Sequence, residues 1–310
     1  MKRIIVIALI ISSSVFAIYE FAGTSGMTFL KMNFSPRAAA LGDASVGYAN
    51  GPDGMLSNPA AMSFEKDMSV GTSFGMLYAG ISSGHLVAQK RFGFGKIGIA
   101  TRFVSYGTMD RTDGQGEVLG DFGSTDLAFS VLYSREIFDN FSLGFAPFFA
   151  SSSIDTFVAT AIGVDLGALL KFDRGRGRVG MAVKNLGGQL SACIEKKDTL
   201  ATTVGLGASY RLKGMPVYAL AEGDYCRDSG FSAGFGMELV HFKPLSIRAG
   251  YRIRDKVSGD LAEGEALMNG LTAGFGLHHK GIYADYSFQH YGVLGFTHKF
   301  AVAFDGFASE

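Results

Sequence analysis

Bulky apolar residues occupy alternate positions along most of the chain from about residue 67 to residue 305. In residues 231–239 the odd-numbered positions are apolar, and the even-numbered ones are Ser, Gly, Gly and Glu. Residues 245–253 and 271–277 repeat this pattern. Successive side chains of a β-strand point to opposite faces, so a period of two predicts strands with one apolar face. The pattern therefore predicts an all-β chain.

The lengths of these segments and of their connections indicate strands that cross a membrane. Each segment has about ten residues, which suits a tilted strand in the hydrocarbon layer and exceeds the usual ~5–6 residues of soluble strands. Short connections, such as residues 92–95 and 280–281, alternate with longer ones at residues 107–123, 187–199 and 255–268. Outer-membrane barrels have short turns at one rim and long loops at the other.

The number of segments agrees with a closed barrel. We count about 14 strands, an even number that lets an antiparallel sheet close without a free edge. It also leaves both ends of the barrel on the short-turn side, which is periplasmic in such proteins. The sequence thus predicts a transmembrane antiparallel β-barrel of the bacterial outer membrane, with both termini periplasmic.

The chain begins with the three parts of a secretory signal peptide. Lys2 and Arg3 precede an apolar run over residues 4–11, and small residues follow up to Ala17, after which we expect cleavage. The apolar run is too short for a spanning helix. The expected division is a signal peptide at residues 1–17, a plug at 18–66, the barrel at 67–306 and a tail at 307–310.

Residues 18–66 lack clean alternation and carry helix signals. Ser35 and Pro36 suit the N-cap and first turn of a short helix that Gly42 would end. A second short helix is expected over residues 53–57, before the Asn58–Pro59 pair. A barrel of this size lies between filled eight-stranded barrels and open sixteen-stranded ones. We therefore expect an N-terminal lumenal plug with short helices at the periplasmic end of the barrel.

Composition supports a barrel and narrows the possible partners. The chain has 43 Gly, 27 Phe and 12 Tyr but no Trp, and only 18% charged residues. An interfacial belt would therefore consist of Tyr and Phe. The formal net charge is zero, which gives no indication of a nucleic-acid partner. The partners expected are outer-membrane lipid and the ligands or proteins considered below.

Charges of both signs fall on the positions expected to face the lumen. The strand registers predict the pairs Glu238–Arg248, Asp165–Lys184 and Asp285–Lys299. Such pairs either hold the wall and plug together or line a route for a polar ligand. Glycine doublets at 205/207, 234/236 and 274/276 lie on the same face, where they would give the plug room to approach the wall.

No catalytic set, cofactor motif or metal site emerges from the sequence. The six histidines fall mostly near predicted strand ends, and His278–His279 lacks the spacing of helical zinc ligands. We therefore expect a protein that is not an enzyme and binds no cofactor. Cys193 and Cys226 fall in loops at one predicted rim, where a disulfide between them remains an open alternative.

Motifs in residues 22–62 resemble those of a known family. Residues 22–26, which include Gly23, Thr24, Ser25 and Gly26, precede residues 29–31. Arg37, Leu41 and Gly42 follow within residues 37–44, and Asn58, Pro59 and Ala60 within residues 57–61. Their order and spacing resemble the PorV/PorQ family of outer-membrane proteins, which is similar to FadL-type transporters. The resemblance implies a fourteen-stranded barrel with an N-terminal segment folded into the lumen.

The resemblance also implies work in type IX secretion, where the barrel binds the C-terminal signal domain of an exported protein. The first hypothesis is therefore binding or shuttling of exported proteins at the cell surface, with secreted cargo or secretion-machinery subunits as partners. The alternative is a FadL-like channel for uptake or export of hydrophobic small molecules, with a hydrophobic ligand as partner.

Overall fold

The computed structural model describes residues 23–192, 197–241, 244–254 and 269–306. The predicted signal peptide and tail lie outside these residues. Cys193 also lies outside them, so its disulfide with Cys226 stays a prediction.

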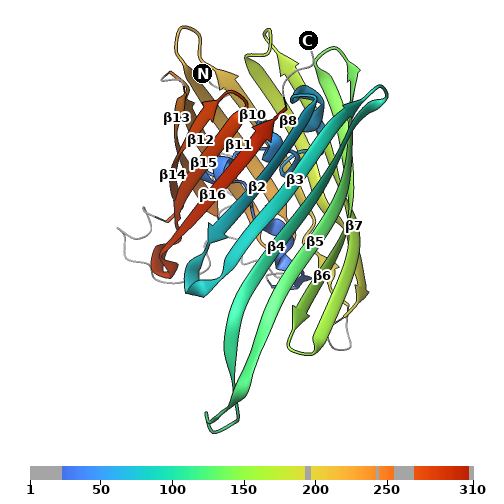
Figure 1. The fold of residues 1–310 in the computed structure, drawn as a ribbon, viewed down its shortest axis with the longest axis vertical. Helices are drawn as coiled ribbons and strands as arrows, with labels where there is room; N and C mark the ends of the chain where they lie inside the picture. Colours follow the sequence, from blue (N-terminus) through green and yellow to red (C-terminus); the bar gives the residue numbers. More distant parts are fainter. Residues whose placement is uncertain (1–22, 193–196, 242–243, 255–268, 307–310) are drawn as a thin grey trace, which may run out of the picture.

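Fourteen antiparallel strands form a closed barrel, which confirms the predicted fold class. The barrel closes where β7 pairs with β8 and β16 pairs with β2. Figure 1 shows the strands tilted around one axis. They are β2 (Met68–Met76), β3 (Ser82–Phe92), β4 (Gly95–Thr112), β5 (Val118–Phe138), β6 (Phe141–Ile154), β7 (Phe157–Phe172), β8 (Gly177–Ser191), β10 (Thr203–Arg211), β11 (Val217–Cys226), β12 (Gly230–Leu239), β13 (Leu245–Arg254), β14 (Leu271–His279), β15 (Ile282–His290) and β16 (Phe296–Asp305).

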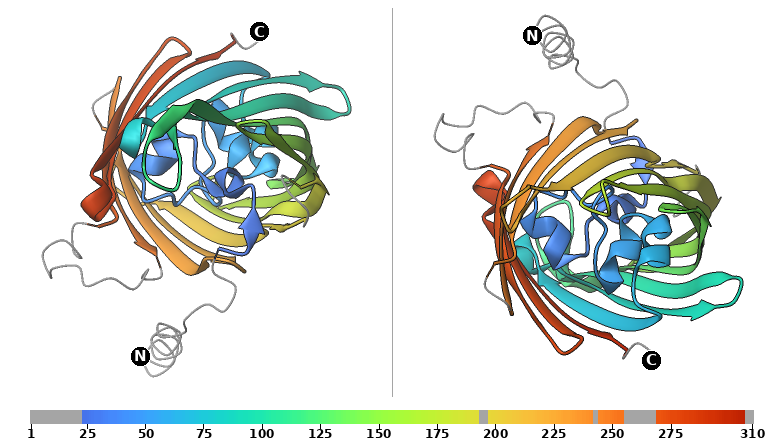
Figure 2. Two further views of the ribbon diagram at one scale, coloured as in Figure 1. Left: turned by 90° about the horizontal axis from the view of Figure 1, so that it is seen from below. Right: turned by 90° about the horizontal axis from the view of Figure 1, so that it is seen from above.

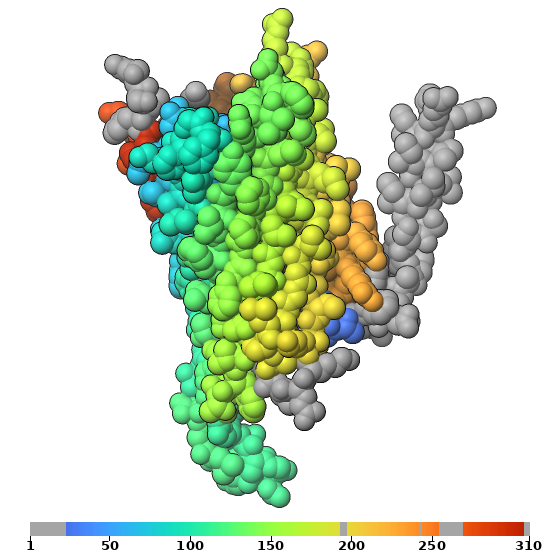
Figure 3. Space-filling model, turned by 90° about the vertical axis from the view of Figure 1, so that its right-hand side faces the viewer, coloured from blue at the N-terminus to red at the C-terminus, as the bar shows by residue number. Residues whose placement is uncertain are grey.

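The two rims of the barrel differ. The β3–β4, β5–β6 and β14–β15 turns lie at one rim, which we call the short-turn rim, together with the start of β2 and the end of β16. At the other rim β4 and β5 continue as a hairpin that projects beyond their neighbours (Figures 1 and 3), and we call it the long-hairpin rim. The predicted long connection over residues 107–123 is much shorter in the structure, because register pairing continues to Thr112 and Val118 after an irregularity between Ser105 and Thr108.

The outer surface of the barrel is an apolar belt. Along β12, Phe231, Phe235 and Met237 point outward with 45–54% of their surface exposed, while Glu238 is fully buried. The same alternation runs along β2, β6 and β14. A continuous apolar outer face is unfavourable in water and favourable in lipid. The strands therefore span a membrane. Among the described residues, no helix is long and apolar enough to do so.

The chain before β2 fills the barrel (Figure 2) and consists of short elements. They are β1 (Ser25–Gly26), η1 (Thr28–Lys31), α2 (Pro36–Ala40), η2 (Pro52–Leu56) and η3 (Pro59–Phe64). As predicted, Ser35 caps α2 by accepting the Ala38 N–H, and Pro36 stands in its first turn. The segment over residues 53–57 is the 3₁₀ helix η2 rather than an α-helix. We call residues 23–66 the plug.

The plug spans the barrel from rim to rim. Its β1 pairs in parallel with β9 (Thr199–Leu200), which joins the far end of β8 at the long-hairpin rim. Its last helix, η3, contacts β4 to β7 and leads into β2 at the short-turn rim. The prediction that the plug lies only at the short-turn end is therefore wrong, because β1 adds to a strand at the opposite rim. Gly23 and the end of β16 lie at opposite rims.

Glycines on the inner wall let the plug backbone approach closely, as predicted. A methyl group on Gly236 would lie 2.6 Å from the Leu41 carbonyl oxygen, and one on Gly207 would lie 2.7 Å from the Gly47 nitrogen. A methyl group on Gly274 would lie 2.6 Å from the Ala40 Cβ. The glycine doublets therefore shape the wall around α2 and the chain that follows it.

Candidate functional site in the barrel lumen

A buried charge network joins α2 to the wall. Arg37 Nη2 lies 2.8 Å from Glu238 Oε1, and Arg248 Nε lies 2.9 Å from the same oxygen. Arg248 also pairs with Asp285 on β15, and the Tyr48 hydroxyl donates to Glu238. The sequence predicted the Glu238–Arg248 pair from the register of β12 and β13, in which these two residues are directly opposite. One carboxylate thus holds two strands and two parts of the plug.

The network favours charged Arg37 and neutral Tyr48. Burial alone would lower the pKa of the Arg37 guanidinium, but the Glu238 carboxylate contributes the opposite effect and the pKa is raised well above its usual value. Burial raises the pKa of Tyr48, and the nearby Glu238 charge raises it further. The phenol therefore stays protonated and acts as a donor.

The other two predicted pairs do not form as expected. Asp165 accepts the Asn185 N–H at 2.7 Å, because β8 has a bulge there with Asn185 in the left-handed region. No ion pair joins Asp165 to Lys184 in the described part of the chain. Asp285 lies opposite Ala301 rather than Lys299, and the Lys299 ammonium donates to the Asn33 carbonyl at 2.6 Å. Both lysines and both aspartates nevertheless belong to inward-facing strand positions.

Asn58 fixes the path of the plug between η2 and η3. Its side chain caps η3 by accepting the Ala60 N–H at 3.1 Å. Its amide nitrogen donates to the carbonyls of Val46 and Ala168, each at 3.0 Å. Pro59 occupies the first turn of η3. One side chain therefore ties two parts of the plug to β7, which is more than the local turn that Asn and Pro alone would form.

An Asn58→Ala variant is expected to lose about 1–3 kcal/mol of plug stability, because Asn58 is fully buried and the Val46 carbonyl, the Ala168 carbonyl and the Ala60 N–H lose their partner. The rate of trypsin cleavage after Arg37 in the folded barrel measures this local opening. Gln115→Ala, on the projecting hairpin, is the control and should cleave like the native chain. Equal rates in the Asn58 variant and the control would contradict the assignment.

The short-turn end of the plug is firmly anchored. The buried Lys96 ammonium donates to the Glu65 and Lys66 carbonyls at 2.5 and 2.6 Å. The Lys171 ammonium lies 3.8 Å from the centre of the Phe64 ring, within the range of a cation–π interaction. The Ser63 and Ser134 hydroxyls lie 2.5 Å apart. These contacts surround η3 on several sides.

The other end of the plug covers an apolar part of the inner wall. Phe29, Leu30 and Phe34 are at most 3% exposed and pack in one cluster with wall residues. The wall side of this cluster consists of Val104, Ala128, Phe148, Ala150, Ala159 and Ala161. We call these six residues the apolar wall patch.

Polar contacts also hold this end. The Ser73 hydroxyl donates to the Phe34 carbonyl at 3.1 Å, and the Lys299 ammonium donates to the Asn33 carbonyl at 2.6 Å. Lys31 forms an ion pair with Asp228, in the β11–β12 turn, at 2.9 Å, and Asn185 donates to the Leu30 carbonyl at 3.4 Å. The four-residue helix η1 has no side-chain cap, and its N-cap Met27 is in the left-handed region. The motif residues Gly23, Thr24, Ser25 and Gly26 lie here, and β1 pairs through two residues. The secondary structure of this end is therefore short, and its contacts with the wall and with β9 hold it in place.

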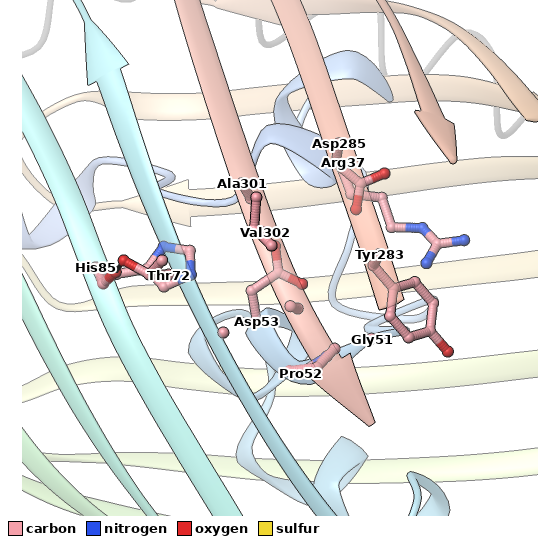
Figure 4. A pocket seen from close by; sticks show the side chains of 12 residues that line it. Arg37, Gly51, Pro52, Asp53, Thr72, His85, Tyr283, Asp285, Ala301 and Val302 are labelled. Atoms are coloured by element: carbon pink, nitrogen blue, oxygen red, sulfur yellow. Dashed lines mark hydrogen bonds between the residues drawn. The ribbon is translucent and has the colours of Figure 1, made fainter. Parts of the chain in front are cut away.

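A small polar cavity lies between the plug and the wall near α2. Figure 4 shows Asp53 from η2 between His85 on β3 and the group formed by Arg37, Tyr283 and Asp285. The cavity has room for about one water molecule. It is too narrow for an organic solute with the plug in this position.

The remaining residues that the sequence singled out form packing contacts and hydrogen bonds within the protein. Leu41 is buried beside Tyr48, and the Gly42 N–H donates to Thr272 on β14 at 3.0 Å. The buried Cys226 thiol donates to Asp228 at 3.0 Å. Tyr48 and the Lys31–Asp228 pair were missed from the sequence, since the partners are 190 and 197 residues apart and no local pattern connects them.

Comparison with known proteins supports the fold. No protein-family model matches the chain, and no curated protein matches it by sequence. Solved structures do match. A TodX deltaS2S3 mutant, a monoaromatic hydrocarbon channel, has 12% identity and a TM-score of 0.61, and the match covers 88% of this chain and 99% of that one.

Two further structures are similar. The CymD monoaromatic hydrocarbon channel has 10% identity and a TM-score of 0.57, with 90% and 97% of the two chains covered. The Pseudomonas putida toluene transporter TodX has 13% identity and a TM-score of 0.56, with 86% and 95% covered. The chain therefore shares the fold of these channels. The PorV/PorQ resemblance gains no support from these matches and stays a prediction.

Proposed function

We propose that this protein is a non-enzymatic channel of the bacterial outer membrane that passes hydrophobic small molecules. The observation that carries the proposal is the apolar wall patch inside the lumen, which Phe29, Leu30 and Phe34 of the plug cover. This protein shares its fold with channels that are described as carrying monoaromatic hydrocarbons and toluene. Of the two hypotheses from the sequence, these observations favour the FadL-like alternative.

The closed arrangement requires part of the plug to move. Phe29, Leu30 and Phe34 fill the space that an apolar solute would occupy against the patch. Movement of residues 23–34 would uncover the patch, and it requires that the Lys31–Asp228 pair and the hydrogen bonds from Ser73 and Lys299 break. By the usual orientation of such barrels, the short-turn rim faces the periplasm and the long-hairpin rim faces outward.

Uptake of radiolabelled toluene by intact Gram-negative cells tests the proposal. Cells that express the protein should take up toluene several-fold faster than cells with an empty vector, because the outer leaflet of their outer membrane resists apolar solutes. Cells that express a barrel of unrelated fold at equal abundance serve as the control. Equal uptake in all three strains would refute a hydrophobic channel.

The motifs in residues 22–62 support a second candidate, the binding or shuttling of exported proteins. This function requires that deletion of the gene change the surface or secreted proteome of the native cell. An unchanged proteome together with reduced toluene uptake would leave the channel as the function.

A further inference from the structure

Two buried side chains on the inner wall, an arginine and a histidine, have nitrogen atoms that form no hydrogen bond in the described structure. Arg102 on β4 and His85 on β3 are directly opposite each other in the strand register. Arg102 is 4% exposed, and its Nε and Nη2 have no hydrogen-bond partner in the described structure. His85 is 2% exposed, and its Nε2 likewise has none, while its Nδ1 contacts the Ser73 hydroxyl at 2.6 Å.

Neither acidic group near Arg102 forms a hydrogen bond with its guanidinium in the described structure. Asp165, which acts on Arg102 through its charge, accepts the Asn185 N–H. Asp126 lies opposite Val104, two positions beyond Arg102 on β4. Its Oδ2 accepts the Tyr106 hydroxyl at 2.7 Å, and its buried Oδ1 has no hydrogen-bond partner in the described structure. An arginine kept in a buried position without a bonded carboxylate is costly, so its retention calls for a partner that arrives from outside.

The free atoms of Arg102 have the geometry of an oxyanion site. Nε–H and Nη2–H form one edge of the planar guanidinium, and this edge donates two parallel bonds to a carboxylate. His85, on the neighbouring strand, adds a third nitrogen on the same inner face. The wall thus offers the Arg102 fork, with the His85 ring on the neighbouring strand at the edge of the small polar cavity.

The surroundings of this fork are apolar. Arg102 is directly opposite Ala128 and two residues from Val104, and its guanidinium carbon lies 6.0 Å from the centre of the Phe148 ring. All three neighbours belong to the apolar wall patch, which Phe34 of the plug covers. A molecule that replaced the Phe34 ring would therefore place an apolar body on the patch and could reach Arg102 with one polar end.

We propose that Arg102 and His85 form a binding site for an aromatic carboxylate, with the carboxylate on the Arg102 fork and the ring on the apolar wall patch. The proposal rests on the proposed function, because the ligand gains access when residues 23–34 move. It adds a substrate class, the small aromatic acid, to the neutral hydrocarbons considered above.

Equilibrium dialysis of the purified full chain in detergent, with radiolabelled benzoate and separately with radiolabelled toluene, tests the site. The native chain should bind both. Arg102→Met should bind benzoate on the order of tenfold more weakly or not at all, because a charge-assisted bidentate pair is lost. It should bind toluene as before, which shows that the variant is folded. Methionine removes the charge while it keeps an apolar chain of similar length.

Arg111→Met is the matched control. Arg111 lies on the exposed β4–β5 hairpin and pairs with Asp155 in the β6–β7 turn, so its replacement should not affect benzoate binding. Equal benzoate binding by the native chain and Arg102→Met would overturn the site. Toluene binding without benzoate binding would overturn the site and leave the proposed function intact. Binding of neither ligand would refute both. Inorganic phosphate that competes with benzoate at equal concentration would overturn the aromatic specificity.

Discussion

A Glu238→Gln variant is expected to unfold with a free energy about 3–5 kcal/mol smaller than that of the native chain. Glutamine keeps the size of the side chain but removes the negative charge that Arg37 and Arg248 share. Arg248 retains Asp285, whereas Arg37 has no other ion pair among the described residues. Removal of one partner from a buried pair costs more than an exposed pair contributes, because the remaining charge is desolvated and unpaired.

Urea unfolding of the protein in lipid vesicles, followed by far-ultraviolet circular dichroism, measures this loss. Glu117→Gln is the control, because Glu117 lies on the exposed hairpin and should change stability by less than about 0.5 kcal/mol. A similarly small effect in Glu238→Gln would show that the network does not hold the plug to the wall.

Local sequence rules were sufficient for the barrel. A period of two assigns each side chain of β12 to lipid or lumen, and tight turns such as residues 280–281 set the register of the strands beside them. The Glu238–Arg248 pair follows from that register. These features depend on neighbours along the chain, so a single sequence contains the information.

Predictions from regular register failed where the strands are irregular. The bulge at Asn185 brings its N–H to Asp165 in place of Lys184. The β15–β16 connection holds the short helix η5 (Gly292–Leu294), and the resulting register places Asp285 opposite Ala301. The projecting β4–β5 hairpin resembled a loop because its residues are polar and glycine-rich at the irregular positions.

Local sequence rules do not predict the path of the plug through the barrel. Short helices were indicated by Ser35, Pro36 and Gly42, but the wall that each one contacts is far away in sequence. The Lys31–Asp228 pair joins residues 197 positions apart. Contacts of this kind depend on the closed barrel, and they include the residues on which the proposed function rests.

A disulfide between β1 and the residue before β9 is expected to abolish hydrocarbon uptake. A Cβ atom on Gly26 would lie 3.1 Å from the Asp198 Cβ, slightly closer than the usual ~3.5–4.5 Å of disulfides, so a small shift suffices. The Gln189 amide, at the end of a flexible side chain, would have to move aside. The variant Gly26→Cys/Asp198→Cys, with Cys193→Ser and Cys226→Ser, would tether residues 23–34 against the wall.

The rate of toluene uptake by cells that express this variant, before and after reduction with dithiothreitol, is the decisive measurement. The single variants Gly26→Cys and Asp198→Cys, in the same cysteine-free background, control for the substitutions. We expect the oxidised double variant to show only the uptake of cells without the protein, and the reduced form to recover the rate of the single variants. Uptake that is equal in the oxidised and reduced forms, with the disulfide verified, would contradict a channel that opens by movement of the plug.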